Sequence, residues 1–258
     1  MAFALITGGS GGIGLSCARE LARQKHDVLL VARSAEQLSK HCDEIRKEFN
    51  VKADFLSLDL SAPNAHISVK NWLDQNNFPV DILVNNAGYA VWNPVEKSTL
   101  QELTNMMQLN MNTLVNLCHT LLPDLKKQSK SFILNVASTT AYQAIPTMAT
   151  YAASKAFVVL FTRGLRKELK ESSVSVSCLS PGTTSTGFMD RASMQALKAT
   201  ADKFSMSPEA VAKIAIAGML KGKAEIIPGF INWFSVQLTY FVPKSITEKV
   251  AEGLYKTN

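Results

Sequence analysis

The segment FALITGGSGGIG, residues 3–14, joins a short apolar run to a glycine-rich loop and then to an amphipathic stretch. Glycine lets the backbone turn tightly and approach a pyrophosphate, whose charge the N-terminus of the next helix stabilises. The order predicts a dinucleotide-binding unit, although a glycine turn also serves simply to pack a helix on a strand. Two glycine spacings fit the loop, and periodicity does not choose between Gly9–Gly11–Gly14 and Gly8–Gly12–Gly14.

Beyond the loop, short apolar runs alternate with longer segments of helical spacing. This alternation is typical of a parallel sheet covered by helices on both faces. We therefore predict an α/β fold, a doubly wound parallel sheet (Rossmann fold), as a single domain over residues 1–258. The predicted strands are FALIT (3–7), DVLLVA (27–32), ADFLSL (53–58), VDILVN (80–85), SFILNVA (131–137), VSVSCLS (174–180) and AEII (224–227).

Two helix starts carry side chains suited to capping. Ser34 with Gln37 predicts one capping box, and Thr99 with Glu102 predicts another. Pro123 falls late in the long helix that starts near Thr99, so we expect a kink or an approaching helix end there.

Composition and charge argue against several classes of protein. The net charge is +6, but the 27 basic residues are scattered, so no nucleic-acid partner is predicted. No basic region precedes the first strand, so no signal peptide is predicted, and we expect a cytoplasmic protein. Neither a disulfide framework nor a metal site is predicted from the four widely spaced cysteines, Cys17, Cys42, Cys118 and Cys178.

The turn after the second predicted strand bears on cofactor choice. It reads Ala32, Arg33, Ser34, with no carboxylate to hold a free ribose 2′-hydroxyl. Arg33 offers a planar cation suited to a 2′-phosphate, while Glu36 is explained by the dipole of the following helix. NADP(H) is therefore the predicted cofactor, with Arg33 as an ordinary surface residue the alternative.

Two heptapeptides, TYAASKA (150–156) and TYFVPKS (239–245), each place a lysine four residues after a tyrosine. Tyr151 and Lys155 should share one face of a helix. In the second heptapeptide Pro243 interrupts the helix, so Tyr240 and Lys244 need not share a face. A lysine about 4 Å from a tyrosine favours the phenolate by roughly 4 kcal/mol at an intermediate dielectric, enough to bring its pKa near 7.

Several motifs recur in a fixed order along the chain: TGGSGGIG (7–14), DL (59–60), NNAG (85–88), NMN (110–112), Ser138, YAASK (151–155) and PGTTST (181–186). As a set, they closely resemble the short-chain dehydrogenase/reductase family over residues 2 to about 186. The resemblance selects the spacing Gly8–Gly12–Gly14. It also implies that Tyr151 and Lys155 are the reactive pair.

The resemblance implies a cofactor site at the strand ends, although each residue has an alternative role in a turn or cap. Asp59 and Leu60 would contact the adenine, and the 181–186 loop would hold the nicotinamide end. The implied cofactor-binding residues are Gly8, Ser10, Gly11, Gly12, Ile13, Gly14, Arg33, Ser34, Asp59, Leu60, Asn86, Ala87, Gly88, Tyr151, Lys155, Pro181, Gly182, Thr184 and Thr186.

The implied catalytic residues are Asn110, Ser138, Tyr151 and Lys155. Tyr151 would exchange the proton of the substrate oxygen, which Ser138 would hydrogen-bond, and Lys155 would lower the tyrosine pKa. Asn110 would position a water for proton relay. Ser138 alternatively serves as a turn residue, and three other asparagines share the polar stretch: Asn105, Asn112 and Asn116.

Two later segments bear on the substrate. Residues 187–206 occupy the place of the family's substrate lid, and their phenylalanines and methionines suit either an apolar substrate or core packing. Residues 226–255 are predicted to close the cleft. Residues 226–242 carry no charge but are too short and interrupted to span a bilayer, leaving interfacial membrane contact as the alternative.

The helix that bears Tyr151 and Lys155 is apolar on both sides. The inner side, expected to face the cofactor and the sheet, consists of Tyr151, Lys155, Val158, Val159, Thr162 and Leu165. The outer side holds Ala156, Phe157, Leu160, Phe161 and Gly164, which needs a cover. The family resemblance implies that this cover is a four-helix bundle with the helix around 110–128, in a homodimer or homotetramer. The predicted function is an NADP-dependent oxidoreductase that interconverts a carbonyl (ketone, aldehyde or 3-oxoacyl) and an alcohol by hydride transfer, with an apolar small-molecule substrate. The alternatives are a noncatalytic NADPH-binding sensor and a sugar-nucleotide epimerase of the extended branch.

Overall fold

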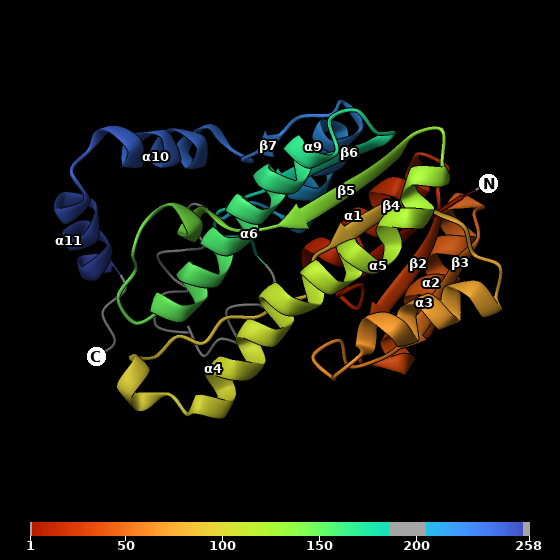
Figure 1. Ribbon diagram of the computed structural model, residues 1–258, viewed down its shortest axis with the longest axis horizontal. Helices are drawn as coiled ribbons and strands as arrows, with labels where there is room; N and C mark the ends of the chain where they lie inside the picture. Colours follow the sequence, from red (N-terminus) through yellow and green to blue (C-terminus); the bar gives the residue numbers. More distant parts are fainter. Residues whose placement is uncertain (1, 186–204, 255–258) are drawn as a thin grey trace.

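The computed structural model describes residues 2–185 and 205–254, and its centre is a parallel seven-stranded sheet (Figure 1). The order β3-β2-β1-β4-β5-β6-β7 confirms the doubly wound arrangement, and each predicted strand forms, with β7 shorter than expected. The strands are β1 (Phe3–Thr7), β2 (Asp27–Ala32), β3 (Ala53–Ser57), β4 (Val80–Asn85), β5 (Ser131–Val136), β6 (Val174–Leu179) and β7 (Glu225–Ile226).

Helices cover both faces of the sheet because its inner strands are apolar on both sides. In β1, Phe3 and Leu5 belong to one buried cluster, whereas Ala4 and Ile6 belong to the other. The first cluster includes residues of α3 (Ala65–Gln75), α5 (Thr113–Lys127) and α6 (Ala149–Glu168). The second includes residues of α1 (Gly12–Arg23), α2 (Ala35–Phe49) and α9 (Pro208–Leu220).

Helix capping follows the sequence at one of the two predicted positions. Thr99 and Glu102 form the complete capping box at the start of α4 (Leu100–Met107). The predicted box at Ser34 is wrong: Ser34 is the N-cap of α2, but its side chain makes no capping bond. The first-turn N–H groups of an exposed helix end can bond to water instead.

The long helix after Thr99 contains a π-helical turn that the sequence did not predict. A π-helical turn, η2 (Gln108–Asn112), separates α4 from α5. Pro123 lies inside α5, which ends four residues later at Lys127, as the proline led us to expect. Such π turns occur frequently at functional sites because the extra residue redirects side chains.

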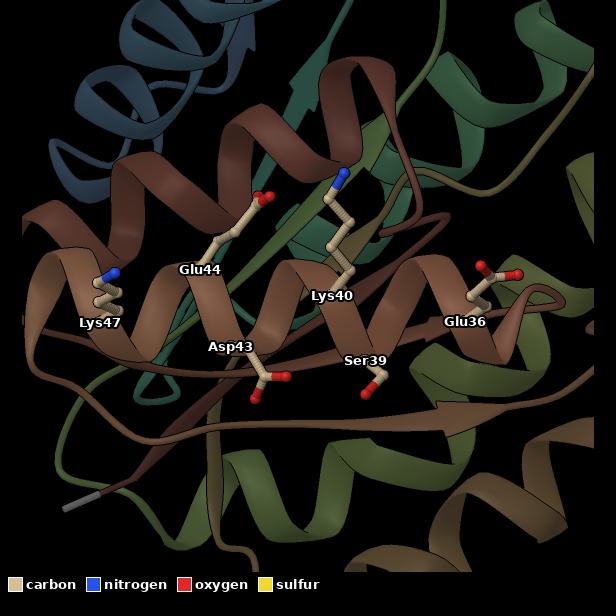
Figure 2. A pocket seen from close by; sticks show the side chains of 6 residues that line it. All are labelled: Glu36, Ser39, Lys40, Asp43, Glu44 and Lys47. Atoms are coloured by element: carbon tan, nitrogen blue, oxygen red, sulfur yellow. The ribbon is translucent and has the colours of Figure 1, made fainter.

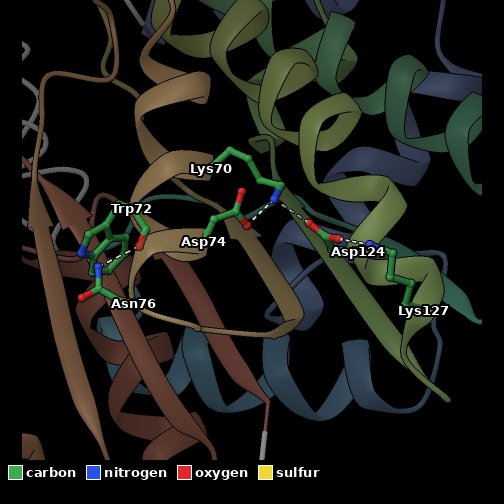
Figure 3. A network of polar contacts seen from close by, with 6 residues as sticks. All are labelled: Lys70, Trp72, Asp74, Asn76, Asp124 and Lys127. Atoms are coloured by element: carbon green, nitrogen blue, oxygen red, sulfur yellow. Dashed lines mark hydrogen bonds and ion pairs between the residues drawn. The ribbon is translucent and has the colours of Figure 1, made fainter.

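Charged side chains fasten α3 to α5 on the surface (Figure 3). Lys70 of α3 pairs with Asp74 on its own helix and lies 3.3 Å from Asp124 of α5, which also pairs with Lys127 at 2.7 Å. At the C-terminal end of α3, the side chain of the capping residue Asn76 donates to the Trp72 carbonyl at 2.8 Å. These partly exposed pairs contribute modestly to stability and play no part in the site below.

The C-terminal region forms two helices at one end of the molecule, α10 (Phe230–Phe241) and α11 (Lys244–Leu254) (Figure 1). Val242 is extended (ψ 137°) before Pro243, and α11 begins directly after the proline. Tyr240 and Lys244 therefore belong to different helices, as predicted. None of the helices in the described residues has the length and apolar character needed to span a membrane.

Two short 3₁₀ turns complete the described elements: η1 (Val95–Lys97) and η3 (Thr139–Tyr142). The predicted lid at 187–206 lies outside the described residues except for Ser205 and Met206, and so does Thr186. Met206 forms an isolated parallel bridge with Thr184.

Candidate active site

The glycine loop between β1 and α1 settles the spacing that the sequence left open. Gly8 and Gly12 have left-handed φ angles of 69° and 54°. A Cβ on Gly14 would lie 2.4 Å from the carbonyl oxygen of Gly8, whereas a Cβ on Gly11 would meet nothing within 4 Å. The constrained glycines are therefore Gly8, Gly12 and Gly14. Since α1 has no side-chain cap, the loop and helix N-terminus suit a phosphate group.

Two side chains brace this loop against the end of β4. Asn86 donates from its side-chain amide to the Thr7 carbonyl at 2.9 Å, and the Thr7 hydroxyl accepts from the backbone N–H groups of Asn86 (2.9 Å) and Ala87 (3.0 Å). Thr7 was not among the predicted site residues. Its sequence signals are its position at the end of the strand and its place as the first residue of the TGGSGGIG motif.

The predicted adenosine residues lie at the ends of β2 and β3. Arg33 is exposed, and its carbonyl accepts from the Ser57 hydroxyl at 2.9 Å. Hydrogen bonds from the Ser61 hydroxyl and backbone lower the pKa of Asp59, and the charge of Arg33 adds to this effect. Leu60 is buried instead, with its carbonyl accepting from Thr113. Three other predicted residues are half-buried: Ser10, Ile13 and Ser34.

Asn110 is held differently from its neighbouring asparagines. It lies in the π turn η2, is 1% exposed, and exchanges two hydrogen bonds with the backbone of Tyr89, at 3.1 and 3.0 Å. Its side-chain amide also donates to the Ser154 hydroxyl at 3.1 Å. Asn105 and Asn112 are exposed and bond to glutamines on the same surface. The structure thus sets Asn110 apart from both.

Lys155 of α6 is buried, with 5% of its surface exposed. Its ammonium donates to the Val136 carbonyl at 2.9 Å and lies 5.8 Å from the centroid of the Tyr151 ring. A Cβ on Gly88 would come within 3.5 Å of Lys155 Nζ and 2.8 Å of Asn110 Oδ1, so these three residues meet at one point. Burial lowers the pKa of Lys155 to about 8.

The lowered pKa of Lys155 predicts a specific dependence of stability on pH. The ammonium titrates near 8 in the folded chain and near 10.5 when unfolded, so the folded state binds fewer protons between these values. Stability should therefore rise with pH across that window. We expect the unfolding free energy of the wild type, relative to Lys155→Met, to increase by about 3 kcal/mol from pH 8 to pH 10.5 in urea denaturation without cofactor. If the difference in unfolding free energy between wild type and Lys155→Met did not change with pH, the lowered pKa of Lys155 would be contradicted.

Ser138 follows β5 and begins the turn η3. Its hydroxyl oxygen accepts from the Thr140 N–H at 3.2 Å, so the turn role considered for this residue is real, while the hydroxyl proton remains available for another acceptor. The next N–H, of Thr139, donates to the Pro181 carbonyl at 3.0 Å. This bond joins the Ser138 turn to the predicted nicotinamide loop, where Thr184 is also buried.

A buried tyrosine that the sequence did not single out holds the same turn. The Tyr142 hydroxyl donates to Glu225 of β7 at 2.5 Å and shares a 2.8 Å hydrogen bond with Ser180. Burial, reinforced by the bond to Glu225, raises the pKa of Tyr142. Tyr142 therefore fastens the Ser138 turn to the last two strands. No spacing in the sequence relates it to Glu225, which is 83 residues away.

Among the described residues, one cavity lies far from this site and another lies beside the η3 turn. One, of about 570 Å³, lies on the charged outer surface of α2 among Glu36, Lys40, Asp43 and Lys47 (Figure 2). Its alternating charges are typical of a solvated helix face. The other, of about 710 Å³, is bounded by η3, the start of α6 and Glu248 of α11. Neither is lined by Ser138, Tyr151 or Lys155.

These features define the class of protein. A parallel sheet with the order reversing between β1 and β4, and a glycine loop at that point, is a Rossmann-type fold. The sequence pattern of the short chain dehydrogenase family matches residues 2–197, and the chain belongs to that family.

Similar proteins agree with this assignment. The very-long-chain 3-oxoacyl-CoA reductase of Rattus norvegicus is 30% identical over 183 residues, 69% of this chain and 58% of that protein. An uncharacterized oxidoreductase of Staphylococcus epidermidis is 31% identical over 200 residues, 75% of this chain and 85% of that protein. A short-chain dehydrogenase from Sphingobium yanoikuyae in complex with NADPH has a TM-score of 0.83 at 27% identity, covering 93% and 94% of the two chains. The chain thus spans less than two thirds of the rat reductase.

Proposed function

We propose that this protein is an NADP(H)-dependent oxidoreductase that interconverts a carbonyl and an alcohol. The observation that carries the proposal is the buried ammonium of Lys155, 5.8 Å from the Tyr151 ring and beside Asn110 and Gly88. A buried cation next to a tyrosine favours the phenolate form. The relatives support the chemistry, since one is a 3-oxoacyl-CoA reductase and another was solved with NADPH.

The described residues fit a dinucleotide along the strand ends. The loop of Gly8, Gly12 and Gly14 would hold the pyrophosphate at the N-terminus of α1, and Arg33 would hold the 2′-phosphate at the end of β2. Lys155 would bind the nicotinamide ribose, beside Gly88. When bound, the nicotinamide supplies a hydride to a carbonyl carbon or accepts one from an alcohol.

Residues of the chain would then transfer the proton and stabilise the negative charge that develops on the substrate oxygen. Tyr151 would donate its proton to the alkoxide oxygen during reduction and remove it during oxidation. Ser138, whose hydroxyl proton remains available, would hydrogen-bond that oxygen. The Asn110 side chain, which Tyr89 and Ser154 hold in place, would position a water that resupplies the proton.

A panel of carbonyl compounds tests the activity. We expect NADPH oxidation with at least one apolar ketone, aldehyde or 3-oxoacyl thioester, the last class being suggested by the rat relative. Binding of NADPH without turnover of any compound would instead favour the noncatalytic sensor. The four free, buried cysteines suit a reducing compartment, and we place the protein in the cytoplasm.

Arg33 should set the preference for NADP(H). We expect Arg33→Ala to weaken NADPH binding by roughly 1.5–3 kcal/mol, the scale of a charge-assisted hydrogen bond, and to change NADH binding little. Titration calorimetry with both cofactors measures the difference. The control variant is Lys47→Ala, which removes one positive charge from the outer surface of α2 and should not change the binding of either cofactor. Equal loss of both cofactors in Arg33→Ala would reject this role.

We also propose a homo-oligomer formed through α5 and α6. All six residues expected on the inner side of α6 are buried: Tyr151, Lys155, Val158, Val159, Thr162 and Leu165. On the outer side Leu160 is 70% exposed, and Phe157, 39% exposed, stacks on Phe161 with ring centroids 6.0 Å apart. Among the described residues, no atom lies within 4 Å of a Cβ on Gly164, which leaves room for close approach.

Charge on this outer side should separate the subunits. We expect the double variant Phe157→Glu/Phe161→Glu to be monomeric at micromolar concentration, because two carboxylates would be buried without partners in the bundle. Light scattering of wild type and variant measures the mass of each. Leu100→Glu, a 78% exposed apolar residue on α4, is the control and should stay oligomeric. A wild-type monomer would contradict the proposed assembly.

A further inference from the structure

Helix α10 carries an unusual share of the exposed apolar surface. Of the fifteen exposed large hydrophobic side chains in the described residues, seven lie on this helix of twelve residues. Phe241 is 83% exposed and Phe230 75%, and no residue from 226 to 242 carries a charge. An apolar patch of this kind on a helix usually marks a docking surface.

One side of α10 packs against the protein, and the other side is exposed. Val236 and Thr239 are buried on the inner side, and Asn232 lies against Gly182, where a Cβ would come within 2.4 Å of its side chain. On the outer side, residues at helical spacing form a continuous row that we call the α10 stripe. The stripe consists of Phe230, Phe234, Leu238 and Phe241, with Phe230 and Phe234 stacked at 6.2 Å.

The stripe alone is smaller than a stable protein interface. Its four side chains are 45–83% exposed, so at about 200 Å² for a fully exposed large side chain they offer on the order of 500 Å². Stable protein interfaces bury about 800 Å² per partner. A lipid surface has no such minimum, because each inserted side chain adds to the affinity.

The composition of α10 also favours a lipid surface. Trp233 and Tyr240, 46% and 58% exposed, lie along one edge of the stripe, and these two residue types prefer the boundary between lipid and water. We propose that the α10 stripe docks the protein on a lipid surface, with α10 lying in the plane of the interface. On α11, Lys244 and Lys249 are balanced by Glu248 and Glu252, so apolar insertion rather than attraction to anionic lipid drives the docking.

The stripe lies on the helix that also borders the candidate active site. Asn232, on the inner side of α10, lies against Gly182, and Tyr240, at the edge of the stripe, places its ring 6.5 Å from that of Tyr142. If the proposed function holds, an apolar substrate dissolved in the lipid would reach the site from the docked side. This consequence rests on the proposed function, but the docking itself does not.

Vesicle flotation tests the docking with the full chain. We expect the wild type to float with phosphatidylcholine vesicles, with little change when anionic phosphatidylglycerol is added. Phe234→Ser/Phe241→Ser should lower the partition coefficient at least tenfold, since two apolar side chains no longer insert. The matched control, Ile67→Ser/Leu100→Ser, removes exposed apolar residues from α3 and α4 and should float like the wild type. Circular dichroism and melting temperature confirm that both variants fold.

Each outcome decides the matter. Failure of the wild type to float, or equal flotation of the Phe234→Ser/Phe241→Ser variant, would overturn the proposal. Loss of an oligomer in that variant, without vesicle binding by the wild type, would assign the stripe to a second copy instead. Tyr151→Phe should float like the wild type. Flotation together with absence of any NADPH turnover would reject the proposed function while leaving the docking intact.

Discussion

Replacing Tyr151 by phenylalanine is expected to lower turnover by about 10²–10⁴-fold while leaving NADPH binding nearly unchanged. The substitution removes the hydroxyl that exchanges the substrate proton, but it keeps the ring beside Lys155 and leaves the glycine loop untouched. Steady-state rates and a cofactor titration on the same preparation separate the two effects.

Tyr240→Phe is the matched control for this experiment. Tyr240 ends α10, and the lysine four residues later begins a different helix after Pro243. Its ring lies 6.5 Å from that of Tyr142, a contact that phenylalanine preserves. Turnover should therefore stay at the wild-type level. Comparable losses in the two variants would show that the reactive pair has been assigned wrongly.

Replacing Gly14 by alanine is expected to weaken NADPH binding by about two orders of magnitude. The added methyl group would lie 2.4 Å from the Gly8 carbonyl oxygen and 2.5 Å from the Asn86 side chain, so the loop must shift. A shifted loop loses hydrogen bonds to the phosphates, and each bond to a charged group contributes about 1.5–3 kcal/mol.

Gly11→Ala adds the same methyl group at a position where no atom of the described part of the chain lies within 4 Å. Its φ of 170° is an extended conformation open to any residue. We expect NADPH affinity within a few-fold of the wild type, with melting temperatures showing that both variants are folded. Wild-type affinity in Gly14→Ala would mean that the loop does not hold the cofactor.

The architecture followed from the sequence because its signals are local. Apolar runs such as DVLLVA predicted strands on their own, and alternation with helices predicted a parallel sheet. The Ser34 capping box failed because residue types permit a capping bond without requiring one. The residues alone left two glycine spacings open; the family resemblance selected Gly8–Gly12–Gly14, and the left-handed φ angles of Gly8 and Gly12 agree with that choice.

The parts of the site that depend on contacts between residues far apart in the sequence could not be predicted. Nothing in QLNMN announces the π turn that buries Asn110 against Tyr89 and Ser154. Thr7 braces the loop through bonds to residues some 80 positions away, and Tyr142 reaches Glu225 across an even longer separation. Such partners depend on how the strands are ordered in the sheet, which no short spacing encodes.

The most direct test of the proposed function is transfer of deuterium from C4-deuterated NADPH to the product. Wild-type enzyme, with the carbonyl compound it reduces fastest, should give an alcohol with deuterium on the carbinol carbon, from one of the two C4 positions only. Tyr151→Phe should form the same labelled alcohol far more slowly. NADPH bound tightly by wild-type protein that forms no labelled alcohol from any ketone, aldehyde or 3-oxoacyl thioester would contradict the account.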